Sequence, residues 1–415
     1  LEGYAAVGAD GPLLSPLTMN QSRVMPFGSE LMYLPDRIPL LYDLRRTCIT
    51  AVDDNPHTPG QPIFPVAVFN SPGHVVTHAC AYKERQGAGL LPLFSYGAVG
   101  WRHGKFHSAT ACVDDEPRQD LRRMPLAGIQ AGVRNMRRQL PHNRLRVHLE
   151  RCALVYGCPA GKNFFLGRYE APLPTARTCN ARCLGCISLQ PDGCLPSSQD
   201  RITFTPSPRE IAEVALAHIE KVPDAVVSFG QGCEGDPLMA ADTITEAIRM
   251  IRAHTHQGTI NMNTNGSLPE KIDRLLAAGL DSLRISMNSV RKTCYEAYFR
   301  PNGYVFEDVL ATIALGLAHK SHLAINYLNC PGFTDTPEEY GALVEFLARY
   351  PVHMIQWRNL NFDPLHYLRI MNDIARHTCP MGMSRLLEEL SRRFPALAHG
   401  YFNPPKSNFR VKENR

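Results

Sequence analysis

The chain has 415 residues, of which 44% are hydrophobic and 20% charged, and a formal net charge of +5 at pH 7. This length exceeds what one hydrophobic core usually supports, so at least two domains are expected, and the composition excludes extensive disorder. The 13 cysteines lack the dense spacing of a disulfide scaffold and favour a reducing, cytoplasmic location, and no apolar run predicts a membrane span.

The first part of the chain consists of short apolar pieces separated by Pro, Gly, His and Asn, for example residues 62–70 and 90–101. This pattern predicts a mostly β accessory domain over residues 1–125. Residues 126–170 predict a basic helical connector, with helix around 127–156. Because eleven Lys or Arg face only two acids between positions 117 and 168, this segment is a candidate surface for an anionic partner.

From about residue 170 onward, apolar β-branched runs alternate with amphipathic segments, as parallel strands with crossover helices require. This alternation predicts about six β/α units over residues 171–365, open or closed into a barrel. A helical extension with a basic tail follows over 366–415. Strands are expected at 169–173, 224–230, 258–266, 281–289, 322–329 and 353–360, and helices at 207–222, 240–254, 268–279, 304–319 and 336–349.

Three cysteines, Cys179, Cys183 and Cys186, stand in the stretch CNARCLGC with CxxxCxxC spacing. Structural zinc usually takes four closed ligands, and a redox pair needs only two of these thiols. An iron-sulfur cluster is the better interpretation, because three thiolates on one loop leave one iron of a [4Fe-4S] cluster open. Zinc and incidental clustering remain the alternatives at this point.

The same spacing resembles the cluster loop of the radical SAM superfamily, and the ends of the following strands extend the resemblance in chain order. The second strand leads into EGDP, similar to the GGEP motif of the family; the third ends in NTNG; the fourth ends in SMNS; the fifth leads into PGFTD. Carried over residue by residue, the resemblance assigns S-adenosylmethionine (SAM) contacts to Glu234, Gly235, Asp236, Pro237, Asn263, Asn265, Ser286 and Asn288.

The resemblance implies a radical SAM partial (β/α)6 barrel with an additional mostly β N-terminal domain. It also implies an oxidoreductase or transferase in which Cys179, Cys183 and Cys186 hold one [4Fe-4S] cluster, SAM is cleaved to a 5′-deoxyadenosyl radical, and a substrate loses a hydrogen atom. An electron donor such as flavodoxin or ferredoxin is an expected partner. Gln356, Arg358 and Asn359, at the end of the sixth strand, are expected near SAM or the substrate.

The substrate is left open by the sequence. A peptide or protein is favoured by the resemblance to activating and maturase enzymes, RNA such as tRNA by the basic segment, and a small molecule is a further possibility. A hypothesis of another class is a zinc-stabilised binding protein without catalysis.

Other cysteines and histidines are weaker candidates. Cys152, Cys158 or Cys194 could ligate an auxiliary cluster, but no paired cysteines follow near the C-terminus, so a single cluster is expected. In the N-terminal part His78, His103 and His107 have no paired ligand spacing and are expected to be structural.

Overall fold

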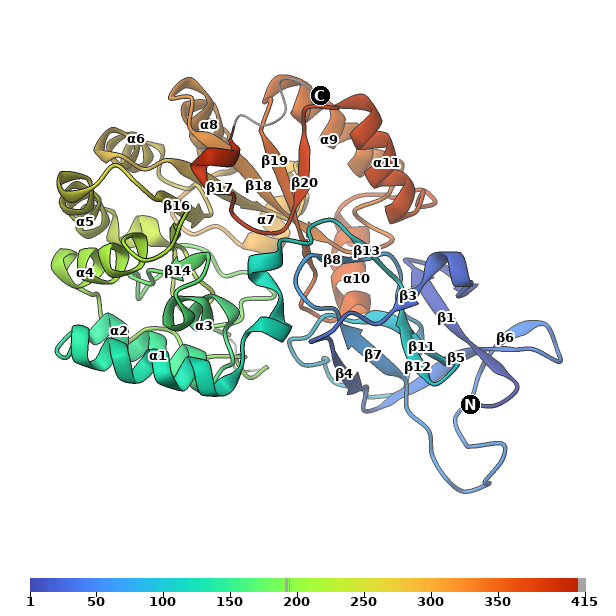
Figure 1. Ribbon diagram of the computed structural model, residues 1–415. Helices are drawn as coiled ribbons and strands as arrows, with labels where there is room; N and C mark the ends of the chain where they lie inside the picture. The colour runs from blue at the N-terminus through green and yellow to red at the C-terminus, as the bar shows by residue number, and fades with distance from the viewer. Residues whose placement is uncertain (191–192, 194, 410–415) are drawn as a thin grey trace.

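The computed structural model describes residues 1–190, 193 and 195–409, with a β-rich N-terminal region on one side and a curled parallel sheet lined by helices on the other (Figure 1). Within the described residues, no helix combines the length and apolar character that crossing a membrane requires. All cysteines that the structure describes are free thiols.

The N-terminal region is built almost wholly from strands, as the sequence predicts. Eleven of them form one antiparallel sheet, and β8 pairs with β13 in a second. The strands are β1 (Tyr4–Asp10), β2 (Leu13–Pro16), β3 (Arg23–Val24), β4 (Glu30–Tyr33), β5 (Arg37–Asp43), β6 (Cys48–Ala51), β7 (Val66–Phe69), β8 (His74–Val76), β9 (Ala79–Cys80), β10 (Tyr82–Glu84), β11 (Gly97–Arg102), β12 (Lys105–Ser108) and β13 (Thr110–Cys112).

Three helices connect the two halves: α1 (Leu126–Gln139), α2 (Arg144–Leu154) and α3 (Pro159–Leu166). Asn143 caps α2 by accepting a hydrogen bond from the Arg146 amide, and Pro159 opens α3. The three helices pack against one another and, through α3, on the first parallel strand.

The second half is a seven-stranded parallel sheet whose strands lie in chain order. All six expected strands are present, and the three-residue β20 is an addition too short to be read from the sequence. The strands are β14 (Glu170–Pro172), β15 (Val226–Phe229), β16 (Thr259–Thr264), β17 (Ser282–Met287), β18 (His322–Asn329), β19 (Met354–Asn359) and β20 (Ala398–Gly400).

Helices follow the strands and lie along one side of the curled sheet (Figure 1). The helix expected to begin at residue 207 does begin there, since Ser207 and Glu210 form a reciprocal capping box at the N-terminus of α4. Helix α7 lies between two expected elements and was not predicted. The helices are α4 (Pro208–Ile219), α5 (Ala241–His254), α6 (Pro269–Ala278), α7 (Lys292–Phe299), α8 (Phe306–Ala318), α9 (Pro337–Arg349), α10 (Pro364–Ile374) and α11 (Met383–Arg393).

The central strands alternate in polarity, which distinguishes the two faces of the sheet. Apolar positions such as Ile285, Ile325 and Ile355 stand in register and are fully buried within the main hydrophobic core. A parallel sheet covered on both faces would have nearly continuous apolar strands. Here the intervening positions are polar and several are partly exposed, so one face packs on helices and the other is a polar face, called the chamber face below: Ser228, Asn261, Asn263, Arg284, Ser286, Asn326, Gln356 and Arg358.

The N-terminal region docks across the carboxyl ends of β18 and β19. Asn359 accepts a hydrogen bond from the Val76 amide at 2.8 Å and donates one to the His74 carbonyl at 2.9 Å. Asn329 donates to the Val76 carbonyl at 2.8 Å. Of the roles that the sequence leaves open for Asn359, near SAM or the substrate or structural, this contact between the two halves supports the structural one.

Candidate functional site

The loop that carries Cys179, Cys183 and Cys186 follows β14 and packs against the end of α7. The Arg182 amide donates to the Phe299 carbonyl at 2.9 Å, and the Leu184 amide donates to the Tyr298 carbonyl at 3.0 Å. These backbone hydrogen bonds hold the loop as a rigid extension of the sheet edge.

The three thiols lie in a partly buried environment. Burial raises the pKa of Cys179 to about 12, and burial together with the neighbouring thiols raises that of Cys183. One cation is at hand, since Arg201 Nη2 donates to Cys186 Sγ at 3.6 Å. A positively charged metal centre would reverse the cost of forming thiolates here.

The spacing of these thiols differs from that of ligands for a single ion. Ligands of one ion stand close together. Among the described residues, three such side chains have their ligand atoms within 4.8 Å of one another, but they lie elsewhere in the chain and do not include Cys179, Cys183 or Cys186. Cysteines that bind separate irons of a cluster stand further apart than ligands of one ion. The loop therefore suits a cluster better than a zinc ion.

The loop after β15 lies against the chain that enters the cysteine loop. The Gly235 amide donates to the Ala176 carbonyl at 2.7 Å and the Asp236 amide to the Thr178 carbonyl at 3.0 Å. A Cβ on Gly235 would stand 1.9 Å from the Thr178 carbonyl oxygen, so only glycine permits this approach.

The Glu234 carboxylate is surrounded by backbone amides. It accepts hydrogen bonds from Thr175 and Ala176 at 2.7 and 2.9 Å, and from Gly230 and Gln231 at 2.7 Å each. Burial raises its pKa to about 7 against the opposing effect of these four donors. The carboxylate thus joins the ends of β14 and β15, a geometry that suits positioning of the loop more than direct contact with SAM.

Asp236 joins the next pair of strand ends. One carboxylate oxygen accepts from the Leu238 amide and the Thr264 hydroxyl, and the other accepts from the Asn265 amide at 2.7 Å. The hydrogen bond to Leu238 also caps the short helical turn that begins at Pro237. Burial raises the pKa of Asp236. The charge of its carboxylate contributes to the raised pKa of Cys179, because the carboxyl group lies beside the cysteine loop.

The asparagines after β16 connect the same elements. Asn265 donates to the Asn180 side chain at 2.8 Å, and Asn263 donates to the Gly230 carbonyl at 3.1 Å. The EGDP and NTNG segments, 26 or more positions apart, therefore contact one another and the cysteine loop, as the order of the strand ends predicts.

The strand end of β17 carries the last pair of predicted SAM contacts. Asn288 is fully buried and donates to the Cys294 carbonyl and to the Tyr367 hydroxyl at 3.1 Å each, while its Oδ1 has no protein partner. Ser286 is partly exposed on the chamber face and stands opposite Asn326. An unpartnered buried acceptor beside a partly open polar row is a fit for a ligand with hydrogen-bond donors.

Comparison with known proteins agrees with this geometry. The family model described as "Radical SAM superfamily" matches residues 173–347, which include the cysteine loop and the strand ends described above. These residues form a radical SAM domain.

Individual relatives are distant. The chain is similar to Molybdenum cofactor biosynthesis protein 1 of Mus musculus, at 27% identity over 238 residues, which are 54% of this chain and 34% of that protein. The chain therefore spans about a third of the length of this curated relative.

Solved structures with the same kind of domain are also similar to the chain. One is a radical SAM methyltransferase from Sphaerobacter thermophilus, with 15% identity, a TM-score of 0.40, and coverage of 56% of this chain and 66% of that one. Another is SuiB of Streptococcus suis bound to S-adenosylmethionine, with 13% identity, a TM-score of 0.38, and coverage of 56% and 50%.

Two guanidinium groups lie on the chamber face, within the strands of this domain and the strand that follows it. Gln356 Oε1 accepts from Arg284 Nη1 at 2.8 Å and from Arg358 Nη2 at 3.4 Å, and Arg358 lies 3.6 Å above the Tyr401 ring. Burial, reinforced by Arg358, lowers the pKa of Arg284 to about 9, and burial lowers that of Arg358. Neither forms an ion pair with a carboxylate of the described residues, and Arg284 Nε has no partner.

Sequence reasoning had selected Gln356 and Arg358 and missed Arg284. The available signal was position: Arg284 precedes Ser286 by two residues on β17 and therefore shares its face. A charged residue in the middle of a strand, two positions from a serine, indicates that this side of the strand is polar.

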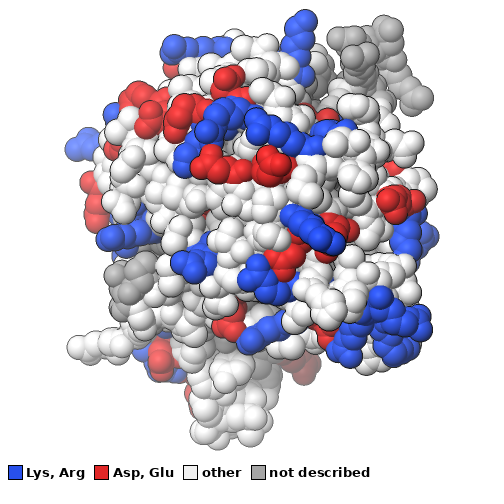
Figure 2. Space-filling model, turned by 90° about the vertical axis from the view of Figure 1, so that its left-hand side faces the viewer, with Lys and Arg blue, Asp and Glu red and all other residues white. Residues whose placement is uncertain are grey.

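Most arginines of the basic segment between positions 117 and 168 are engaged in ion pairs or hydrogen bonds within the protein. Its arginines pair with Glu116, Asp120, Glu150, Asp200 and Glu210, and Arg168 donates to the backbone carbonyls of Arg118 and Arg123 at 2.6 Å each. Figure 2 shows the side of the molecule that lies at the left of Figure 1. Basic and acidic side chains are interspersed over this side, with one compact basic group at the lower right.

The remaining metal candidates separate into those that lie together and those that do not. His78, His103 and His107 belong to no group of metal-ligand atoms among residues 1–190, 193 and 195–409. Cys194 lies outside the described residues. Cys152 does belong to such a group, with His148 and Cys233.

Proposed function

We propose that the enzyme binds one [4Fe-4S] cluster through Cys179, Cys183 and Cys186, and binds SAM at the adjoining ends of β15, β16 and β17. When bound and reduced by a one-electron donor such as flavodoxin or ferredoxin, the cluster would supply the electron for reductive cleavage of SAM, and the 5′-deoxyadenosyl radical so formed would abstract a hydrogen atom from the substrate. The observation that carries this proposal is the attachment of the cysteine loop to the EGDP and NTNG segments by Gly235, Asp236 and Asn265.

The roles of the protein residues follow from their contacts. Glu234 and Asp236 fix the loop that adjoins the thiols, and the free Oδ1 of Asn288 is placed to accept a hydrogen bond from SAM. The main hydrophobic core lies behind these strand ends, and its low polarity strengthens the polar contacts that are buried against it.

The chamber also supports a proposal about the substrate. Two partly buried guanidiniums that form no ion pair with a carboxylate of the described residues can accept an anion at modest desolvation cost. We infer that the substrate, a peptide or protein segment in the favoured version, presents a carboxylate or a similar anionic group to Arg284 and Arg358. A small anionic molecule would satisfy the same two residues.

Reconstitution with iron and sulfide under anaerobic conditions tests the cluster and the cleavage. We expect about four iron atoms per chain and 5′-deoxyadenosine after reduction with SAM present. Cys183→Ala should lose both, whereas Cys80→Ala, a buried thiol of the N-terminal region, should keep both. A cluster-replete protein that yields no 5′-deoxyadenosine would refute the proposal, and zinc without iron would support the non-catalytic alternative.

RNA remains an alternative substrate, weakened by the ion pairs of the basic segment. Arg134 and Arg138 are exposed on α1 and suit a test better than Arg137, which pairs with Glu150. Salt-sensitive tRNA binding that is lost on Arg134→Glu and Arg138→Glu would favour RNA, and unchanged or absent binding would favour the anionic chamber ligand.

A further inference from the structure

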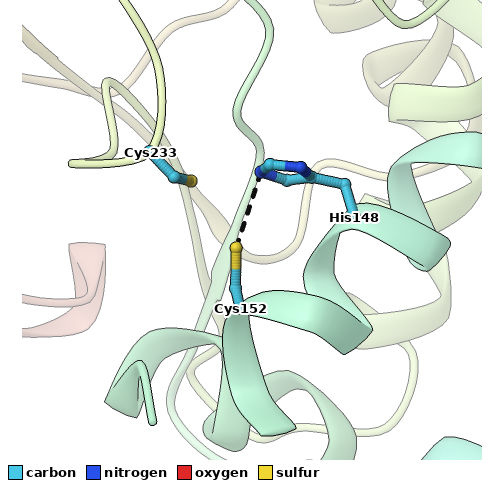
Figure 3. Close-up of side chains that lie close together, drawn as sticks. All are labelled: His148, Cys152 and Cys233. Atoms are coloured by element: carbon cyan, nitrogen blue, oxygen red, sulfur yellow. Dashed lines mark hydrogen bonds between the residues drawn. The ribbon is translucent and has the colours of Figure 1, made fainter. Parts of the chain in front are cut away.

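Three potential metal ligands converge outside the cysteine loop. His148 and Cys152 lie one helical turn apart on α2, and Cys233 reaches them from the loop after β15 (Figure 3). Their ligand atoms all lie within 4.8 Å of one another, and Cys152 Sγ stands 3.5 Å from His148 Nε2. Residues four apart on a helix share one face, so α2 presents two ligands in the same direction.

The two thiols of this trio are shielded from water, and the His148 ring is partly exposed. Cys152 and Cys233 are 2% and 5% exposed, and the His148 ring packs edge-on against Phe204. Cys233 is held in place because its carbonyl accepts a hydrogen bond from the Ile202 amide at 2.8 Å. Figure 3 shows the three side chains pointing toward a common centre.

We propose that His148, Cys152 and Cys233 bind a single structural zinc ion, with Cys158 as the fourth ligand. Zinc prefers tetrahedral sites of sulfur and imidazole nitrogen with bonds of about 2.0–2.3 Å, so its ligand atoms stand roughly 3.3–3.8 Å apart. The separations within the trio need only a small contraction, whereas Cys158 Sγ is not within 4.8 Å of all three and must move toward them to join the site. Each bound thiol releases its proton to solvent on binding.

Cys158 is suited to the fourth position by its location. It immediately precedes α3, and its amide donates to the Cys152 carbonyl at 2.9 Å. Its thiol interacts electrostatically with both Cys152 and Cys233. A Cys3His set is a usual ligand combination for structural zinc.

The site would link two parts of the enzyme. Cys233 immediately precedes Glu234, whose carboxylate holds the ends of β14 and β15, while His148 and Cys152 belong to α2. A zinc ion here fastens the connector helices to the loop that adjoins the cysteine cluster. An auxiliary iron-sulfur cluster is less suitable, because its thiolates would bind separate irons and stand further apart.

Metal analysis of the full-length protein tests the site. After anaerobic reconstitution we expect about one zinc ion beside about four iron atoms per chain. Cys152→Ser, Cys233→Ser and His148→Ala should each lose zinc and keep iron, whereas Cys294→Ser, another buried thiol, should keep both. Absent zinc, zinc retained in all three variants, or extra iron that disappears in Cys152→Ser would overturn the proposal.

A second measurement covers variants that fold poorly. Wild-type protein purified with cobalt in place of zinc should show thiolate-to-cobalt charge-transfer absorption, and X-ray absorption at the zinc edge should show three sulfurs and one nitrogen. Coordination by oxygen alone would contradict the site. Because zinc is counted directly, its absence would leave the cluster proposal standing, and loss of the cluster would leave the zinc count unchanged.

Discussion

Arg37 and Asp363 form a buried ion pair that joins the N-terminal region to the start of α10. Arg37 Nη2 stands 3.3 Å from Asp363 Oδ2, and the two side chains are 2% and 1% exposed. Asp363 also accepts from the Tyr82 hydroxyl at 3.3 Å and from the Leu91 amide at 3.2 Å, and it caps α10 through the Leu365 amide. One carboxylate therefore anchors strand, loop and helix together.

Removal of this carboxylate should destabilise the protein strongly. We expect Asp363→Ala to lower the free energy of unfolding by about 3–5 kcal/mol, because Arg37 keeps a buried charge with one carboxylate fewer. Asp53→Ala, which removes the exposed partner of Arg85, should have a far smaller effect, because solvent screens that pair. Urea unfolding measures both, and equal effects of the two substitutions would contradict the anchoring role.

Gly235 should tolerate no side chain. Gly235→Ala would push the loop away from the Thr178 carbonyl, so we expect a loss of at least about 2 kcal/mol in stability. Iron retained after reconstitution should fall as well, because the chain before Cys179 moves. Gly341→Ala, in α9 with no atom within 4 Å of the new methyl group, should instead stabilise by about 0.5–1 kcal/mol. An equally stable Gly235→Ala protein with full iron content would show that the close approach is dispensable.

His218 should make stability depend on pH. Burial lowers its pKa from 6.5 to about 4, although its Nε2 lies 3.2 Å from the Tyr169 carbonyl. Between these values the unfolded chain binds a proton that the folded chain does not, so stability falls as the pH falls from 6.5 to 4.

The matching variant isolates this contribution. Relative to His218→Gln, which does not titrate, the wild-type protein should lose about 3 kcal/mol across that pH range. Chemical denaturation of both proteins at pH 7, 6, 5 and 4 gives the comparison. Parallel pH profiles would mean that His218 is protonated in the folded state.

The Arg284 side chain should lower the free energy of unfolding of the protein when no anion is bound to it. We expect Arg284→Met to raise the free energy of unfolding by about 1–3 kcal/mol, since a buried charge without a carboxylate partner is replaced by an apolar side chain. Inorganic phosphate should raise the melting temperature of the wild-type protein more than that of the variant. A destabilised variant, or equal responses to phosphate, would assign Arg284 a purely structural role.

The parallel half of the fold could be predicted because its strands are local apolar runs of ordinary length. The predicted range 281–289 contains β17, and 322–329 coincides with β18. The contact of EGDP with NTNG also followed from sequence, since consecutive parallel strands end at one edge of a sheet. Strand β20 was missed because three residues, one of them glycine, carry too little pattern.

Other features depend on contacts that no local pattern encodes. Cys233 and Cys152 are 81 positions apart, and no local pattern joins them, although His148 and Cys152 show helical ligand spacing. The four amides from two segments that surround the Glu234 carboxylate were not predictable from its motif. The hydrogen bonds of Asn359 to β8 were not predictable from its position at a strand end either. In each case the partner comes from a distant part of the chain.

The hydrogen bonds from Asn329 and Asn359 to β8 join segments that lie more than 250 positions apart in the chain. Separating the N-terminal region from the ends of β18 and β19 would leave these amide groups without their protein partners, which is costly for buried polar groups. We therefore expect the β-rich region and the parallel sheet to unfold together rather than one after the other.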